Sequence, residues 1–432
     1  MFLGQDVVEL VFKFEQIICL NKEIKGKYPT FFKNISYVAL ATFAEALIWF
    51  IFNILTGRML GPDEYGKFTL IHSIGMLLYL PMMFGISTGM VKYSSEKRDF
   101  DRQRIIISTS FLLVIIFTFS FIFIYSGLTL ILSEILSVPE KIIKLGITFS
   151  VFYVFYLITT STFQGTHQIK KFALIKYIYS AIMLISFFII TSTGDNSYKI
   201  PLYSMYVAYL ISGIIAIWLI AGHIIPKYDD KWVRTLIKYG SFTFLSAMSY
   251  ILCTNVDKIL INKYLTSEAV GLYNAYNLSS MKIIGMFSGI FITVFFPTIS
   301  GYEDKSTILK KFGTFVPYIL LFGVPLIIIA QVITLKLYGD EYGININLML
   351  IFAITSVLFV LYDIYGWIFN SIGINGVKLT MWGTSTIALV DIFLNMQLIP
   401  RFGLEGAIAS TAISYLIGLC VIHIMKGKLI SI

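Results

Sequence analysis

Hydrophobic residues along this chain gather into long segments separated by short polar stretches. Each segment is close to the roughly 20 apolar residues that a helix needs to cross the hydrocarbon core of a bilayer. The pattern predicts twelve spans, at residues 35–56, 67–91, 105–125, 142–164, 172–193, 202–225, 239–262, 273–297, 312–333, 346–370, 379–399 and 406–425. We therefore expect an all-α integral membrane protein, because a helix satisfies its own backbone hydrogen bonds in lipid.

Basic residues in the loops predict the orientation of these spans. The loops on the amino-terminal side contain 23 Lys and Arg residues, whereas those on the opposite side contain 8. Basic loops tend to stay in the cytoplasm, so we predict a multi-pass protein of the plasma or inner membrane with both termini cytoplasmic. The net charge of +9 then reflects topology and contact with anionic membrane lipids, and we expect no nucleic-acid partner.

A weak internal repeat predicts the domain organisation. When the chain is shifted by 205 positions, Leu60, Asp63 and Gly66 fall on Leu265, Glu268 and Gly271, and each triplet marks a helix end with an acidic turn. We expect two pseudo-symmetric six-helix lobes, residues 35–237 and 238–432, related by an axis along the membrane normal. Residues 1–34 have apolar positions at helical spacing with charges between them, which predicts a cytoplasmic amphipathic extension.

Composition adds two exclusions. Hydrophobic residues make up 57% of the chain and charged residues 13%, so little is left for a soluble domain. The 3 cysteines and 4 histidines have no spacing typical of a disulfide framework or a metal site. We therefore expect no cofactor and no metal, other than a proton or Na⁺ that drives transport.

Six ionisable residues lie inside predicted spans, at Glu45, Asp257, Lys258, Lys282, Asp363 and Asp391. Each costs about 2.5–3.5 kcal/mol at a helix centre, so each either serves a polar pathway or pairs with another to hold helices together. Further polar and aromatic residues share helix faces with the carboxylates, namely Thr42, Trp49, Asn53, Tyr250, Thr384 and Asn395. We expect these faces to line a hydrated cavity between the lobes.

The charges within and beside the spans suggest separate roles. Arg58, Lys258 and Lys282 are the candidates to hold a phosphate group, with Lys176 near an inner helix end. The ion-coupling candidates are the carboxylates Glu45, Asp257, Asp363 and Asp391. Helical geometry turns Lys258 about 100° away from Asp257, so the two should face different places.

Several motifs carry a family resemblance. The run Arg-Met-Leu-Gly-Pro-Asp-Glu-Tyr-Gly at 58–66, and the segments 255–258, 265–273, 337–342 and 394–407, resemble turns of the polysaccharide flippase family (Wzx-like) of the multidrug/oligosaccharidyl-lipid/polysaccharide (MOP) exporter superfamily. The resemblance implies a polyprenyl-linked phosphate or pyrophosphate oligosaccharide as substrate, alternating access between MATE-like lobes, and ion coupling. It also implies other glycan-assembly membrane proteins as partners.

Two other functions stay open at this stage. A cation-coupled multidrug exporter of the same superfamily is favoured by the excess of carboxylates over lysines inside the spans. A membrane-embedded glycan polymerase or ligase is disfavoured, because such enzymes need sizeable outer loops and those predicted here are short. The chain has no GxxxxGK[ST] phosphate loop, so we expect no ATP hydrolysis and no enzymatic activity.

Overall fold

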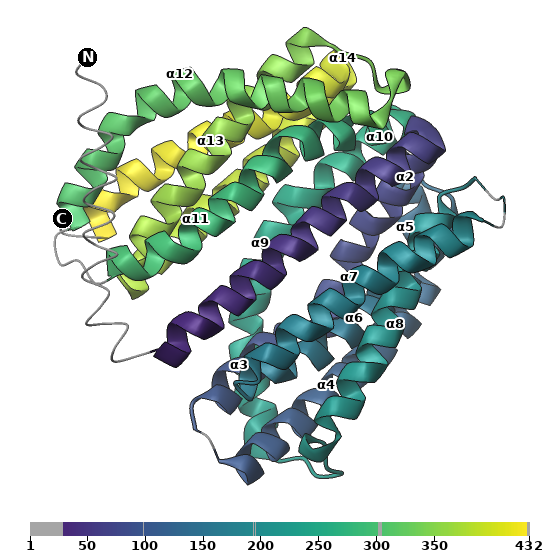
Figure 1. Cartoon of the computed structure of the whole chain (residues 1–432), viewed down its shortest axis with the longest axis vertical. Helices are drawn as coiled ribbons and strands as arrows, with labels where there is room; N and C mark the ends of the chain where they lie inside the picture. Colours follow the sequence, from purple (N-terminus) through teal and green to yellow (C-terminus); the bar gives the residue numbers. More distant parts are fainter. Residues whose placement is uncertain (1–28, 98, 193, 195, 301–304, 430–432) are drawn as a thin grey trace.

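The structure is a computed structural model that describes residues 29–97, 99–192, 194, 196–300 and 305–429. These residues are almost entirely helical, and no β-strand occurs among them. The helices form two groups that diverge from a common junction, with α2 and α9 running between them (Figure 1). The predicted amphipathic segment 1–34 falls mostly outside the described residues, and α2 already begins at Pro29.

The order of the elements follows the predicted order of the spans. The first group contains α2 (Pro29–Met83), α3 (Ile86–Ser95), α4 (Phe100–Gly127), α5 (Thr129–Leu136), α6 (Glu140–Gly165), α7 (Ile169–Thr191) and α8 (Lys199–Ile220), which ends in the 3₁₀-helix η1 (Ala221–His223). The second contains α9 (Asp230–Tyr264), α10 (Ser267–Asn277), the π-helix η2 (Leu278–Lys282), α11 (Ile283–Ser300), α12 (Lys305–Tyr338), the 3₁₀-helix η3 (Asp340–Tyr342), α13 (Ile346–Asn370) and α14 (Ile374–Leu429).

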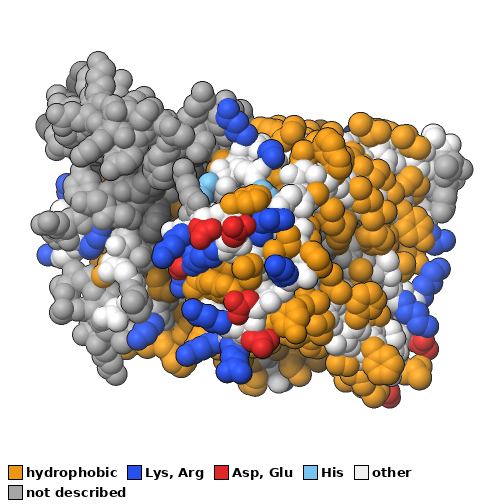
Figure 2. Space-filling view, turned by 90° about the horizontal axis from the view of Figure 1, so that it is seen from below, with side chains coloured by type: hydrophobic (Ala, Val, Ile, Leu, Met, Phe, Trp, Pro, Cys, Tyr) orange, Lys and Arg blue, Asp and Glu red, His pale blue; other side chains and the backbone are white. Residues whose placement is uncertain are grey.

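The described residues confirm the prediction of about twelve crossings. Nine helical stretches are long and apolar enough to cross a membrane, and two of these, Thr42–Met83 and Asn375–Lys426, are 42 and 52 residues long. Each of the two counts as two crossings, because Gly61 (φ 72°) and Gly403 (φ 59°) interrupt the helical backbone. The interrupted run from α10 to α11 supplies one more. Figure 2 shows the matching surface, with hydrophobic side chains between two zones of charge.

Three local features differ from the predicted elements. The span predicted at 67–91 is broken at Phe84 and Gly85, where φ is positive and the Gly85 backbone packs directly against Gly240 of α9. The charged link 226–238 becomes helical at Asp230, because the Asp229 carboxylate accepts a hydrogen bond from the backbone N–H of Lys231 at 2.7 Å. The loop expected between residues 125 and 142 contains the short helix α5.

The two groups of helices meet most tightly where α2 crosses α10, which we call the closed end. Gly66 of α2 and Gly271 of α10, the pair matched by the internal repeat, lie against each other's helices there. A Cβ atom on Gly66 would overlap the carbonyl oxygen of Ser267, and one on Gly271 would overlap that of Pro62. Only glycine permits this backbone approach.

A hydrogen-bond network centred on Tyr65 reinforces the closed end. The Tyr65 hydroxyl donates to Asn53 Oδ1 at 3.0 Å and accepts from Asn274 Nδ2 at 2.6 Å. It also lies 3.0 Å from the hydroxyl of Tyr338 at the end of α12. Tyr342 adds a bond from its hydroxyl to the carbonyl oxygen of Gly57 at 2.9 Å. Side chains of both groups therefore join at this end. Toward the other, open end the groups separate, except that the first part of α9 stays packed against α3 (Figure 1).

Candidate functional site

Four adjoining pockets occur in the described part of the chain, two lined by both groups of helices, one by the first group alone and one by the second group alone. Their volumes are about 200, 160, 490 and 350 Å³, and we name them the Asp257 pocket, the Lys258 pocket, the Glu45 pocket and the α6 groove. Neighbouring pockets share wall residues: Tyr250 and Lys282 join the first two, Trp49 and His72 the second and third, Tyr153 and Gln164 the last two. The shared walls make the four pockets one polar pathway.

The Lys258 pocket presents two ammonium groups. Lys258 is 6% exposed, and its Nζ donates to the carbonyl oxygen of Thr254 at 3.1 Å. Lys282 is exposed although it lies between the helix groups, since it projects into both the Lys258 and the Asp257 pockets. Neither lysine forms an ion pair within the described residues, and no Asp or Glu is among the residues that line the Lys258 pocket. Such a pocket favours an anion, which would supply the missing counter-charge.

A buried acidic cluster lies behind the wall of the Asp257 pocket, where α9 packs against α14. Asp257 is 5% exposed and accepts hydrogen bonds from Tyr273 Oη at 2.7 Å, Asn395 Nδ2 at 2.9 Å and Thr411 Oγ1 at 3.4 Å. Asp391 is 1% exposed, and it lies beside the Asp257 carboxyl group and Thr411. Two buried carboxylates this close repel each other, so the cluster fits a shared proton or a small cation.

The two remaining carboxylates have protein partners. Glu45 forms an ion pair with Lys176 of α7 at 2.7 Å, with side chains 27% and 18% exposed, so its charge is neutralised within the Glu45 pocket. Asp363 of α13 accepts hydrogen bonds from Ser288 Oγ at 2.8 Å and Trp367 Nε1 at 3.1 Å, and it lines the Asp257 pocket. Intramembrane charges could serve only to hold helices together by pairing with one another. Glu45 fits this alternative, but Lys258 and Lys282 do not.

The structure brings most of the sequence-predicted residues to this pathway. The residues that line one of the pockets are Thr42, Glu45, Trp49, Asn53, Tyr250, Asp257, Lys258, Lys282, Asp363 and Thr384. Lys258 and Asp257 open into different pockets, as helical geometry predicts.

Three candidates line none of the four pockets, and one of them is Asp391, which is 1% exposed within the acidic cluster. Asn395, expected on the cavity wall, is fully buried and belongs to the acidic cluster through its bond to Asp257. Arg58 is not brought to Lys258 and Lys282: it is exposed at the closed end, where Nη1 donates to the carbonyl oxygen of Leu337 at 3.4 Å. The physical reason is distance along α2, because Arg58 lies nine residues, or about 14 Å, beyond Trp49.

Sequence reasoning missed several of the polar residues that carry no charge. Asn274 and His72 line the Lys258 pocket, Thr411 joins the acidic cluster, and Ser161 and Gln164 line the α6 groove. Neutral hydroxyl and amide groups are tolerated in membrane helices, so they do not stand out as the ionisable residues do. The available signal was spacing, since Ser161 and Gln164 share one helix face with Tyr153.

The fold and this pathway define a class: an all-helical, multi-pass membrane transporter with a polar cavity between two helix groups. A family described as "Polysaccharide biosynthesis protein" matches residues 31–303, and the chain belongs to this family. A relative in Haloferax volcanii, the probable low-salt glycan biosynthesis flippase Agl15, is 22% identical over 374 residues, which is 83% of this chain and 75% of the relative.

Two solved structures share the fold. An inward-facing multidrug resistance transporter of the MATE family, in the MOP superfamily, matches with a TM-score of 0.68 at 14% identity, over 89% of this chain and 95% of its own. The lipid II flippase MurJ, in an inward closed conformation, matches with a TM-score of 0.62 at 19% identity, over 90% of this chain and 87% of its own. The all-α MOP fold predicted from the sequence is therefore confirmed.

Proposed function

We propose that this protein is a flippase that moves a polyprenyl-linked phosphate or pyrophosphate oligosaccharide across the cell membrane by alternating access. The observation that carries the proposal is the Lys258 pocket, where Lys258 and Lys282 have no carboxylate partner. A phosphate or pyrophosphate would satisfy both ammonium groups, while the lipid tail stays in the bilayer. The name of the relative Agl15, a probable glycan biosynthesis flippase, supports the same substrate class.

The orientation follows from the charge of the loops. Where the structure describes them, the loops predicted on the basic side lie at the open end, and the loops predicted on the opposite side lie at the closed end. The positive-inside tendency makes the open end cytoplasmic, with both termini on that side. The structure then corresponds to a state that loads its substrate from the cytoplasm.

The acidic cluster supplies a place for ion coupling. Asp257 and Asp391 face each other in an almost dry site, and Asn395 and Thr411 add neutral polar groups to it. A proton or Na⁺ bound there would relieve the repulsion between the carboxylates. Since Asp257 and Lys258 both lie on α9, ion binding and substrate binding act on the same helix.

A multidrug exporter is the second candidate, because the MATE transporter has the same fold. A cationic drug needs a free carboxylate on the cavity wall, yet Glu45 is paired with Lys176 and Asp391 is buried. Asp363 is the wall carboxylate best placed for such a drug. A glycan polymerase or ligase gains no support, since Agl15 and both solved structures are named as flippases or transporters.

Transbilayer movement of a labelled lipid tests the proposal. Purified protein in liposomes should expose a fluorescent polyprenyl-pyrophosphate oligosaccharide to a membrane-impermeant quencher much faster than liposomes without protein. Lys282→Ala should slow this movement about tenfold or more, because a charge-assisted hydrogen bond contributes about 1.5–3 kcal/mol. Lys310→Ala, at an exposed position of α12, is the matched control and should behave as the parent. Export of cationic dyes without movement of the lipid-linked glycan would overturn the proposal in favour of a drug exporter.

A further inference from the structure

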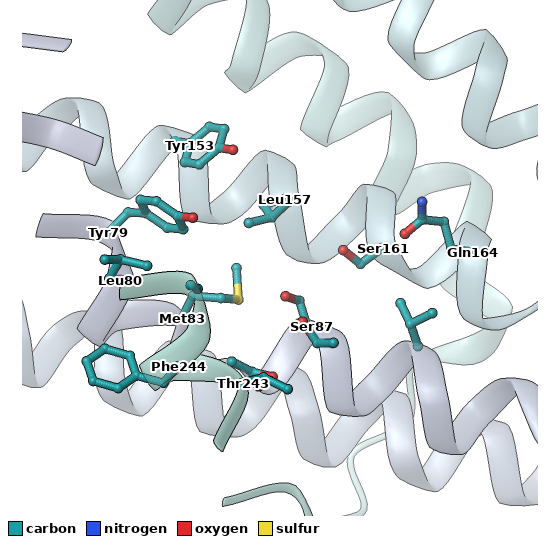
Figure 3. Close-up of a pocket in the computed structure, with 14 residues that line it drawn as sticks. Tyr79, Leu80, Met83, Ser87, Tyr153, Leu157, Ser161, Gln164, Thr243 and Phe244 are labelled. Carbon is teal, nitrogen blue, oxygen red and sulfur yellow. The ribbon is translucent and has the colours of Figure 1, made fainter. Parts of the chain in front are cut away.

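The α6 groove differs chemically from the rest of the pathway. Its volume is about 350 Å³, and none of the residues described as lining it is Asp, Glu, Lys, Arg or His. Its walls combine aromatic rings, such as Tyr79 and Tyr153, with hydroxyl and amide groups, such as Ser87, Ser161 and Gln164. Figure 3 shows the two tyrosines at one end of the groove and Gln164 toward the other, with Ser87 facing the space between.

Five polar side chains of the groove are left free for a ligand, whereas the Thr243 hydroxyl donates to backbone carbonyl oxygens. Thr159, Thr160 and Thr162 on α6 all donate to carbonyl oxygens of the preceding turn, which is the usual way a helix satisfies hydroxyls in lipid. Ser161, between them in sequence and facing the groove, has no side-chain hydrogen bond within the described residues. The same holds for Ser87, for the Gln164 amide and for the hydroxyls of Tyr79 and Tyr153.

We infer that the α6 groove is a subsite for uncharged sugar residues of the transported glycan, which lie along α6 while their phosphate is held at Lys258 and Lys282. Hydroxyl and amide groups can exchange hydrogen bonds with sugar hydroxyls, and aromatic rings pack on the apolar faces of sugar rings. The inference rests on the proposed flippase function and specifies which glycans that function accepts.

The geometry of α6 supports an extended ligand. Tyr153, Leu157, Ser161 and Gln164 follow one another at helical spacing on one face, which spans about 16 Å from first to last. These four residues also line the Glu45 pocket, which in turn adjoins the Lys258 pocket. A glycan anchored by its phosphate at the lysines therefore has a continuous path to the groove.

The same groove disfavours other occupants. An acidic sugar would place a carboxylate where the described walls offer no counter-charge, and a cationic drug would find no carboxylate there. A lipid tail would leave the free hydroxyl and amide groups without partners, at about 1–3 kcal/mol for each buried group. Uncharged sugars therefore match the hydrogen-bonding groups of the groove better than an acidic sugar, a cationic drug or a lipid tail would.

Binding measurements with two lipids test the inference. One probe is a polyprenyl pyrophosphate that carries a neutral oligosaccharide, and the other is the same lipid without sugar. Ser161→Ala with Gln164→Leu should weaken binding of the sugar-bearing lipid about tenfold or more, for two lost hydrogen bonds of about 0.5–1.5 kcal/mol each, and should leave the sugar-free lipid unaffected. Thr159→Val, a buried α6 hydroxyl outside the groove, should change neither affinity.

The outcomes separate this inference from the flippase function. If the groove variant binds both lipids as the parent does, or loses both equally, the sugar subsite is wrong although the flippase function stands. If the parent protein binds neither lipid, the proposed function itself fails. A third probe, carrying a uronic acid in place of one neutral sugar, should bind the parent more weakly and bind Gln164→Lys more tightly than it binds the parent. Equal affinity of the parent for the acidic and neutral glycans would overturn the inference.

Discussion

Asp391 places a carboxyl group in a buried site beside a second carboxyl group. The side chain is 1% exposed, and Asp257 and Thr411 are its polar neighbours. A buried like-charge pair destabilises a fold unless a proton or cation joins it. The arrangement therefore favours binding of a proton or a cation at Asp391.

Asp391→Asn should remove this preference for a positive ion while preserving the shape of the side chain. We expect the variant to unfold at an equal or higher temperature than the parent in detergent without Na⁺, because one buried charge is gone. We also expect flipping to fall about tenfold and to lose its response to Na⁺ and to pH, measured in liposomes at varied gradients. Asp230→Asn, at an exposed carboxylate of α9, is the control. A variant with the parent's rate and ion response would exclude Asp391 from coupling.

Glu45 and Lys176 form the opposite case, a charge pair satisfied within the protein. Glu45→Gln or Lys176→Gln alone leaves the partner uncompensated, so each should lower thermal stability, and the double variant should recover part of the loss. We expect a coupling free energy on the order of 1 kcal/mol, since the pair is partly exposed. If the double variant recovers stability but not flipping, Glu45 has a transport role beyond the pair; additive losses would show that the pair does not matter.

Among the elements, α2 and α10 depend on a contact that only glycine allows. A methyl group at Gly66 would overlap the Ser267 carbonyl, which belongs to helix backbone and cannot rotate away. Gly66→Ala should therefore separate the two helices at the closed end. The result should be a population shift away from the conformation described above.

Disulfide trapping measures this shift. Asp63 and Ser267 are hydrogen-bonded across the closed end, so cysteines at both positions should cross-link readily in an otherwise cysteine-free protein. Gly66→Ala should reduce the cross-linking rate severalfold, whereas Gly127→Ala should not, because a Cβ there meets nothing within 4 Å. Unchanged cross-linking in Gly66→Ala would mean that α2 and α10 accommodate the added methyl group without separating.

The elements also show what the sequence could and could not reveal. Spans such as Ile346–Asn370 were predictable because hydrophobic length alone defines a crossing. The helix breaks at Gly61 and Gly403 fall between predicted spans, whereas the break at Gly85 was not predictable, since a glycine in a helix is common and only the packing around it fixes a positive φ. The polar face of α2 was predictable from periodicity.

At the site, the charged residues were predictable from the sequence, but the residues that contact them were not. Lys258, Lys282 and Asp257 stood out because an ion in hydrocarbon is expensive. The pairing of Asp257 with Asp391, and of Glu45 with Lys176, joins residues 134 and 131 positions apart, which periodicity within one helix cannot connect. The division into lobes at residue 237 stays a prediction.

At the scale of the whole molecule, the two helix groups are joined at one end and apart at the other (Figure 1). Alternating access requires the reverse arrangement in a second state. Spin labels at Lys170 and Lys310 would report the open end, and labels at Lys144 and Lys336 the closed end; all four positions are exposed.

We expect the first distance to shorten and the second to lengthen when lipid-linked glycan and the coupling ion are added together, measured by pulsed electron resonance. Rigid rocking of the two groups requires both changes, because the groups are stiff bundles. A change at one end alone would indicate a local gate instead of a rocking motion. No change at either end, in protein that flips lipid, would exclude rocking.

The π-helix η2 puts one surplus residue into the run between α10 and α11, immediately before α11, which contains Ser288. Deleting a single residue there would restore regular winding and rotate everything downstream by about 100°. Ser288 would then swing away from Asp363, with no change in the hydrophobic character of the segment. The number of residues in this run therefore fixes which side chains of α11 face the cavity. An insertion or deletion there should impair transport more than most substitutions would.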